Sequence, residues 1–201
     1  MAWVGLDGAE GIEKVYDQAR VSFVDLSEGL PRRWRKEWDW VLSIEVAEHV
    51  PREGEATFVH NIVRWARHGV VLTWGHLGQG GHHHINCQSP VYVRCAMGLV
   101  GWTVDIVSTN KLRQSVSGGL GNPGWEAGGA YYEHTLTVFR AADPTARAKA
   151  PLWPLPQRPD QAFTERYLSL TAERCKPRRE GCDQALLSEH EAAVKSGAYD
   201  L

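Results

Sequence analysis

The sequence has no long hydrophobic run and no excess of charge of either sign. No apolar stretch approaches the roughly 18 residues that a bilayer-spanning helix needs, and the opening MAWVGLDGAEG lacks the basic and apolar parts of a secretory signal. Lys and Arg number 22 against 24 Asp and Glu, a formal net charge of −2, whereas nucleic-acid and membrane-surface binders usually carry a basic excess. We therefore expect a cytoplasmic protein with no nucleic-acid or membrane partner.

Cysteine is scarce, and its spacing matches neither a disulfide framework nor a zinc site. The four cysteines are Cys87, Cys95, Cys175 and Cys182, and no two of them form a CxxC pair. Cys175 and Cys182 flank the basic run KPRREG, where a disulfide or half of a zinc site is conceivable, but two isolated thiols are the simpler prediction. This cysteine usage indicates a reducing compartment.

The chain does have enough length and apolar content for one folded core. Its 201 residues are 43% hydrophobic and include nine Trp, which indicates broad aromatic packing. Five prolines fall between residues 143 and 160, a composition typical of an extended linker. The predicted organisation is therefore a domain over residues 1–141, a proline-rich linker over 142–162, and a tail over 163–201 with helix-compatible stretches.

Apolar runs alternate with amphipathic segments along the predicted domain. Strands are predicted at 2–7, 21–26, 40–46, 70–74, 102–109 and 131–141. Helices are predicted at 10–20, at 52–67 with a stop at His68-Gly69, and from Pro90 onward with Ser89 as N-cap. Strands alternating with helices predict an α/β fold, a mostly parallel sheet covered by helices on both faces. The glycine-rich stretch 110–129 predicts that the last two strands form an antiparallel hairpin.

Acidic residues stand at the ends of three successive predicted strands. They are Asp7, Asp25 and Glu45. In an open α/β sheet, ligands bind beyond the carboxyl ends of the strands. Side by side along that edge, three carboxylates would suit a ligand rich in hydroxyl and amino groups, such as a nucleoside. The alternative for Asp7 and Asp25 is an ordinary role in a turn or a helix cap.

The stretch VLSIEVAEHVP, residues 41–51, leads from an apolar strand directly into polar residues. Pro51 disfavours helix at the residue before it, so the segment is predicted to leave the strand as a loop. Glu45 would then stand at the mouth of a cleft, with His49 reaching over it. The alternative is that Glu48 and His49 cap the following helix or pair with a neighbouring Arg.

The stretch GHLGQGGHHHINC, residues 75–87, follows the next predicted strand. One of His82, His83 and His84 can act as a base near neutral pH. Zinc would also accept such imidazoles together with Cys87, but adjacent histidines cannot all point at one ion, and no HExxH or CxxC accompanies them. No metal site is therefore predicted, and an ordinary solvated loop is the remaining alternative.

Together these stretches resemble the class I S-adenosylmethionine-dependent methyltransferases. The matching stretches are VGLDG at 4–8, VDL at 24–26, DWVLSIEVAEHVP at 39–51, VVLTWGHLGQGGHHHIN at 70–86 and YYEHTLTVFR at 131–140. The third is the most specific, because it is similar to the family's D-x-x-x-S-x-E-V-x-E-H segment. The fourth looks like the SWA-x-x-G-Q-G-G-H-x-H-x-N substrate loop of a subgroup. The resemblance covers roughly residues 3–141, about two-thirds of the chain.

The resemblance implies a Rossmann-like sheet that binds S-adenosyl-L-methionine and a small-molecule or protein side-chain acceptor. The implied cofactor-binding residues are Asp7, Gly8, Asp25, Leu26 and Glu45. The substrate-binding residues would be Glu48, Trp74, Gln79 and Asn86, and the catalytic residues His49, His82 and His84. Methyl transfer needs a nucleophile held in line, and a base if that nucleophile begins protonated.

The sequence lacks one part of the family pattern, the first strand and its glycine-rich E/D-x-G-x-G-x-G loop, which cradles the amino-acid end of the cofactor. In the family's strand order, 3-2-1-4-5-7-6, that strand would lie between those ending in Asp7 and Glu45. Its absence leaves two unpaired sheet edges, which invite self-association, or forces their neighbours to pair directly. We expect an N-terminally truncated methyltransferase, or else a non-catalytic relative that keeps the fold for binding. A metal-dependent hydrolase built on the histidine-rich stretch is a third hypothesis.

Overall fold

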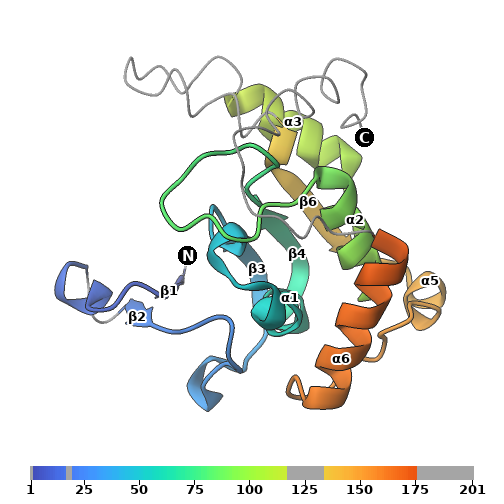
Figure 1. The fold of residues 1–201 in the computed structure, drawn as a ribbon, viewed down its shortest axis with the longest axis horizontal. Helices are drawn as coiled ribbons and strands as arrows, with labels where there is room; N and C mark the ends of the chain where they lie inside the picture. Colours follow the sequence, from blue (N-terminus) through green and yellow to red (C-terminus); the bar gives the residue numbers. More distant parts are fainter. Residues whose placement is uncertain (1, 17–19, 117–133, 176–201) are drawn as a thin grey trace.

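The computed structural model describes residues 2–16, 20–116 and 134–175, whose strands form two sheets. β1 (Gly5–Asp7) and β2 (Val21–Phe23) pair in parallel, apart from a second sheet (Figure 1). That sheet contains β3 (Trp38–Ser43), β4 (Ala66–Leu72), β6 (Thr137–Ala141) and β5 (Trp102–Val104), in this order. β3 and β4 are parallel, whereas β6 is antiparallel to both β4 and β5. The α/β class and the antiparallel pairing of the last two strands are confirmed, but the sheet is mixed rather than mostly parallel.

One hydrophobic core joins the helices to this sheet. α1 (Glu55–Arg64) contacts α6 (Gln161–Leu170), and the π-helical turn η5 (Thr171–Cys175), which continues α6, contacts α2 (Pro90–Leu99). α3 (Ile106–Val116) contacts β6. The predicted cover on both faces is not complete, because Trp40 and Leu42 on one face of β3 are 45% and 68% exposed. None of the described helices combines the length and the apolar character needed to cross a bilayer.

Several predicted element boundaries move, each for a local reason. α2 begins as predicted, with the Ser89 hydroxyl accepting a hydrogen bond from Tyr92 N at 3.1 Å. The strand predicted over 102–109 is wrong beyond Val104, because Asp105 caps a helix there and accepts hydrogen bonds from N and Oγ of Ser108 at 3.0 and 2.7 Å.

Three other predicted elements are shorter than expected. The helix predicted over 52–67 begins with the 3₁₀ turn η4 (Arg52–Gly54) and ends at Arg64, since β4 already begins at Ala66. The helix predicted over 10–20 contains the 3₁₀ turn η1 (Ile12–Lys14), and residues 17–19 lie outside the described residues. The last strand begins at Thr137, and 131–133 also lie outside them.

The C-terminal part of the described chain belongs to the same core. The predicted linker contains α5 (Pro144–Ala148) and buries Leu152 and Leu155 against the domain, and α6 buries Phe163 and Tyr167. Residues 176–201 lie outside the described residues. The segment 142–175 is therefore packed rather than extended.

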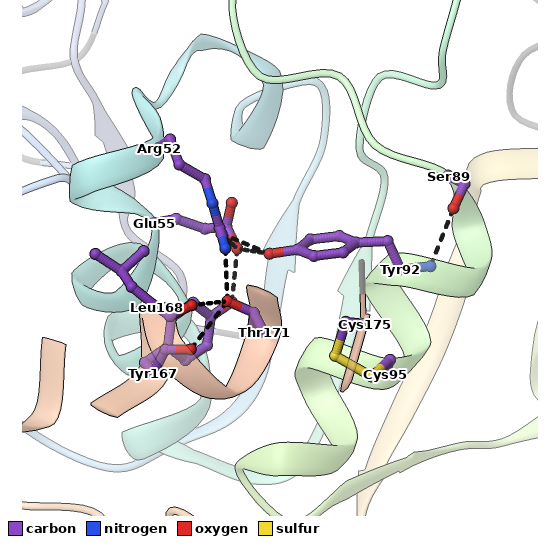
Figure 2. Close-up of a disulfide and its surroundings, with 9 residues drawn as sticks. All are labelled: Arg52, Glu55, Ser89, Tyr92, Cys95, Tyr167, Leu168, Thr171 and Cys175. Carbon is purple, nitrogen blue, oxygen red and sulfur yellow. Dashed lines mark hydrogen bonds and ion pairs between the residues drawn. A yellow bond between two sulfur atoms is a disulfide. The ribbon is translucent and has the colours of Figure 1, made fainter. Parts of the chain in front are cut away.

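A disulfide joins Cys95 of α2 to Cys175 at the end of η5 (Figure 2). The prediction of two isolated thiols is thus wrong for Cys175, while Cys182 lies outside the described residues. The sequence could not reveal this pair, because 80 residues separate the two cysteines along the chain. The inference of a reducing compartment loses its support, since disulfides persist mainly in oxidising ones.

Candidate functional site

The two polar segments of the sequence meet beyond the carboxyl ends of β3 and β4. These strands are adjacent and parallel, with Ser43 opposite Leu72. The loops that follow them are hydrogen-bonded from the start: Thr73 N donates to Ser43 O at 3.0 Å, and Glu45 N donates to Thr73 Oγ1 at 2.7 Å. Ligands of open α/β sheets bind at this edge.

The loop after β3 turns sharply at Glu45. Its φ of 51° lies in the left-handed region, which costs a residue with a Cβ about 1 kcal/mol or more. A 3₁₀ turn, η3 (Ala47–His49), follows, so the segment is not the plain loop that was predicted. Val50 is extended before Pro51, as predicted. The turn buries Glu48 completely and leaves His49 exposed.

The loop after β4 is held by buried polar side chains. The Gln79 amide accepts a hydrogen bond from His76 N at 3.1 Å and donates one to Glu45 Oε2 at 2.6 Å. The Trp74 indole donates to Asn86 O at 2.6 Å. Trp74, Gln79 and Asn86 are only 3%, 3% and 4% exposed. These three residues, predicted to bind substrate, hold the loop in shape in this structure.

Glu48 is buried between the two loops and connects them. Its carbonyl oxygen accepts hydrogen bonds from Ile85 N and Asn86 N, both at 2.9 Å. Its carboxylate is 0% exposed, and neither oxygen has a hydrogen-bond partner among the described residues. Gly75 permits this approach, because a Cβ there would lie 3.0 Å from Glu48 Cβ. Burial, and then the charge of Glu45, raise the pKa of Glu48 to about 7.

His49 and His84 stand next to this carboxylate, with ring centroids 4.8 Å apart. Nδ1 of His49 lies 3.1 Å from His83 O, and Nδ1 of His84 lies 3.1 Å from Gln79 O. Because a carbonyl oxygen only accepts, each Nδ1 carries a proton, so the neutral form of each ring would have its lone pair on Nε2. Nε2 of His84 lies 4.0 Å from Glu48 Oε1. Burial, and then the charge of His84, lower the pKa of His49, which favours its neutral form.

The structure does not bring Asp7 and Asp25 to this cluster through a common sheet. They follow the paired strands β1 and β2, whereas Glu45 follows β3, and no described backbone pairing joins the two sheets. Asp7 Oδ1 accepts a hydrogen bond from Ala9 N at 2.7 Å. Asp25 Oδ1 accepts from N and Oγ of Ser27 at 2.8 and 2.6 Å. Both acids therefore have the local turn role named as the alternative.

Three predicted site residues remain: Gly8, Leu26 and His82. Gly8 directly follows β1, and Leu26 follows Asp25. The Leu26 carbonyl accepts from Asn61 Nδ2 at 3.0 Å, which anchors this segment to α1. His82 is exposed, and its ring lies 3.9 Å from that of His83 rather than in the cluster.

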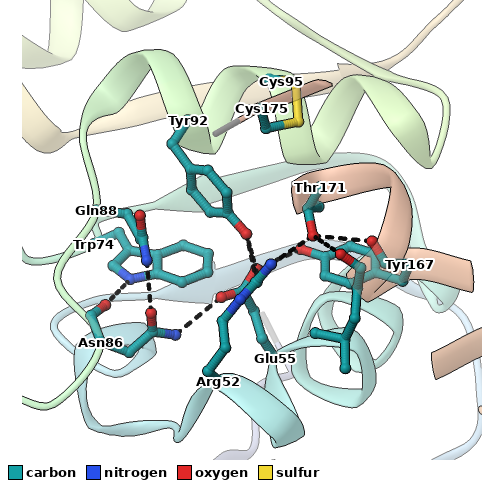
Figure 3. Close-up of polar contacts among 11 residues, drawn as sticks. Arg52, Glu55, Trp74, Asn86, Gln88, Tyr92, Cys95, Tyr167, Thr171 and Cys175 are labelled. Carbon is teal, nitrogen blue, oxygen red and sulfur yellow. Dashed lines mark hydrogen bonds and ion pairs between the residues drawn. A yellow bond between two sulfur atoms is a disulfide. The ribbon is translucent and has the colours of Figure 1, made fainter. Parts of the chain in front are cut away.

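A buried polar network behind the site was not predicted. Figures 2 and 3 show Glu55 at its centre. Oε1 of Glu55 accepts from the Tyr92 hydroxyl and, at 2.8 Å, from the Tyr167 hydroxyl, and it pairs with Arg52 Nη1 at 2.5 Å. Oε2 accepts from Asn86 Nδ2 at 3.0 Å. Burial, and then the charge of Glu55, raise the pKa of both tyrosines, so they remain donors. Because Asn86 also donates to Glu55, the network connects the second loop to α1, α2 and α6.

A separate hollow of about 400 Å³ contains none of the predicted residues. It is lined by Arg32, Arg35, Trp65, Gln157 and Arg158. Trp65 directly precedes β4, at the amino end of that strand, so the hollow lies away from the edge where the two polar loops meet.

Comparison with models of known protein families, with curated proteins and with solved structures finds no match for this chain. Its kinship with the methyltransferases stays a prediction from the sequence.

Proposed function

We propose that the chain is a methyltransferase-type domain of Rossmann-like fold that transfers a methyl group from S-adenosyl-L-methionine to a small molecule or a protein side chain. The order β3-β4-β6-β5, with β6 antiparallel to both neighbours, carries this proposal. It equals the order 4-5-7-6 that the resemblance implies for these strands. β1 and β2, which pair in parallel, correspond to strands 2 and 3 of that order.

The described residues fit the adenosine end of this cofactor in part. Asp7 and Asp25 are exposed at the ends of adjacent strands, and each uses Oδ1 in its turn. We propose that Oδ2 of each acid accepts a hydrogen bond from the ribose or adenine of the cofactor, as acids at such strand ends do. Glu45 Oε1 is buried without a hydrogen-bond partner among the described residues. The amino-acid end is not matched, because the sequence contains no glycine-rich E/D-x-G-x-G-x-G motif.

The histidines can supply a general base, which a methyl acceptor requires if it begins protonated. His49 is exposed, and its Nδ1 faces His83 O, so the Nε2 lone pair can take a proton from a nucleophile. His84 has the same tautomer but lies beside Glu48. His82, which lies outside the cluster, has less support as a base.

A non-catalytic binding module of the same fold is the second candidate. One observation favours it: no described backbone pairing joins Asp7 and Asp25, at the ends of β1 and β2, to the sheet of Glu45.

Calorimetric titration of the full chain with S-adenosylhomocysteine separates the two candidates. We expect binding, weakened about tenfold by Asp25→Asn, because a hydrogen bond to a charged group contributes about 1.5 kcal/mol or more. Asp39→Asn is the matched control, since Asp39 is exposed near the start of β3 and its ion pair with Arg67 is a surface pair of little energy. Absence of heat in the wild type would contradict the enzyme and favour the binding module.

A further inference from the structure

We propose that Glu48, His49 and His84 form a binding site for a divalent transition-metal ion of the zinc class. One donor atom from each of the three residues lies within 4.8 Å of the other two. The residues come from two loops that follow adjacent strands, so the site is built by the sheet topology. Two imidazoles and one carboxylate are a donor set that zinc takes when it keeps one position open.

The carboxylate is the strongest observation for a bound cation. Glu48 is fully buried, and both of its oxygens lack a hydrogen-bond partner among the described residues. Glu45 adds a further buried carboxylate oxygen without such a partner. A buried carboxylate without compensation is costly, so native structures pair it, protonate it or bind it to a metal. Among the described residues, the basic group near Glu48 is the His84 ring, whose Nε2 lies 4.0 Å from Glu48 Oε1 and forms an ion pair with it only when the ring is protonated.

The two imidazoles are held ready for metal binding. Nδ1 of each ring is hydrogen-bonded to a backbone carbonyl, of His83 for His49 and of Gln79 for His84. Such outer bonds fix the tautomer and the ring orientation of metal-binding histidines, and they leave Nε2 as the ligand atom. With zinc bound, the Nε2 lone pair of His49 is occupied, so His49 can act as a base only in the metal-free protein. His49 is exposed, which gives water or substrate access to the open position.

Gly81 lets the His84 ring reach this place. A Cβ at Gly81 would lie 2.3 Å from His84 Nε2, so an alanine there must displace the ring. A Cβ at the neighbouring Gly80 would meet nothing within 4 Å. Comparing Gly81→Ala with Gly80→Ala therefore distinguishes displacement of the His84 ring from a general effect of alanine on the loop.

Zinc titration of the chelator-treated full chain by calorimetry tests the site, with Co²⁺ absorption as a second readout of the ligand geometry. We expect one equivalent to bind, and Glu48→Gln or His84→Gln to weaken binding at least ~100-fold, more than the loss of an outer-sphere partner. Circular dichroism checks that each variant is folded. His84→Gln keeps the test valid if Glu48→Gln does not fold, because the His84 side chain lies in a loop.

The controls decide between this site and other imidazoles of the chain. Gly81→Ala should weaken zinc binding and alter the Co²⁺ spectrum, whereas Gly80→Ala and His82→Gln should leave both unchanged. Two results would overturn the proposal. One is no stoichiometric zinc in the wild type, as expected if a proton rather than a metal neutralises Glu48. The other is unchanged affinity in His84→Gln.

Discussion

Nε2 of His84 lies 4.0 Å from Oε1 of the buried Glu48, although the two residues belong to loops that follow different strands. Because β3 and β4 are adjacent and parallel, their loops leave the same edge of the sheet. Hydrogen bonds from Ile85 N and Asn86 N to Glu48 O then hold the second loop over the first. The polar site is therefore a consequence of strand order together with the packing of these loops.

Gly75→Ala tests the packing beneath Glu48. The added Cβ would lie 3.0 Å from Glu48 Cβ and 3.2 Å from Cys87 Sγ, and overpacking of this kind costs about 1–3 kcal/mol. We expect urea unfolding to show that loss. Gly98→Ala is the control, because a Cβ there meets nothing within 4 Å and lies in α2, where alanine should add about 0.5–1 kcal/mol. Equal effects of both substitutions would contradict this packing.

The location of the site could be predicted because acids and histidines directly follow apolar strands in the sequence. Its detailed composition could not. A left-handed turn at Glu45 precedes the 3₁₀ turn in which Glu48 is buried, and His84 rather than His82 lies beside that carboxylate. Tyr167 reaches Glu55 across 112 residues of sequence, a distance at which apolar periodicity carries no information.

Helix starts that depend on neighbouring residues were predicted in one case and missed in another. The Ser89-Pro90 start of α2 depends on neighbouring residues alone and was predicted. Ile106 and Val107 are β-branched and favoured a strand, but the Asp105 cap directs them into α3. Capping thus outweighed the intrinsic preference of two residues.

Glu55→Gln should lower the free energy of unfolding by about 3 kcal/mol, because it removes the charge that compensates Arg52 and weakens the acceptor of two tyrosine hydroxyls. Urea unfolding measures the loss. Glu53→Gln, an exposed neighbour, should stay within about 0.5 kcal/mol of the wild type. A loss no larger than that of the control would show that the network contributes little.

The disulfide should stabilise the packing of η5 against α2. Replacing Cys95 and Cys175 together by Ser should cost about 2–4 kcal/mol, since the bond closes a long loop in the unfolded chain, with a sequence separation of 80. Unfolding of both proteins without reductant measures this cost. Mass spectrometry after alkylation checks the bond itself, and modification of both thiols in the unreduced wild type would rule it out.

The contribution of His60 to stability should fall as the pH drops below the ordinary histidine pKa of 6.5. Burial lowers the pKa of His60, whose Nε2 lies 2.8 Å from Pro156 O, so the unfolded chain takes up the proton first. The contribution is fully present above pH 6.5 and is lost as the pH falls through that value. His60→Gln should make the decline between about pH 7.5 and about pH 5.5 shallower. Identical slopes in the variant and the wild type would refute the assignment.

The exposed face and the free edge of β3 should promote self-association. β3 pairs with β4 alone among the described strands, and Leu42 is 68% exposed; open edges of this kind attract a second chain. In sedimentation velocity we expect association that grows with concentration and is reduced by Leu42→Lys. Val91→Lys, at an equally apolar exposed position on α2, should not change it. If Leu42→Lys leaves the association unchanged, the contact between chains does not involve this face of β3.

Hydrogen–deuterium exchange with and without S-adenosylhomocysteine tests most directly whether the carboxyl edges of the two sheets receive a nucleoside. We predict that the ligand slows exchange in the segments 5–9, 24–27 and 44–49, which contain Asp7, Asp25 and Glu45. Unchanged exchange in all three, or slowing confined to the hollow of Arg32, Arg35 and Arg158, would contradict the proposed function.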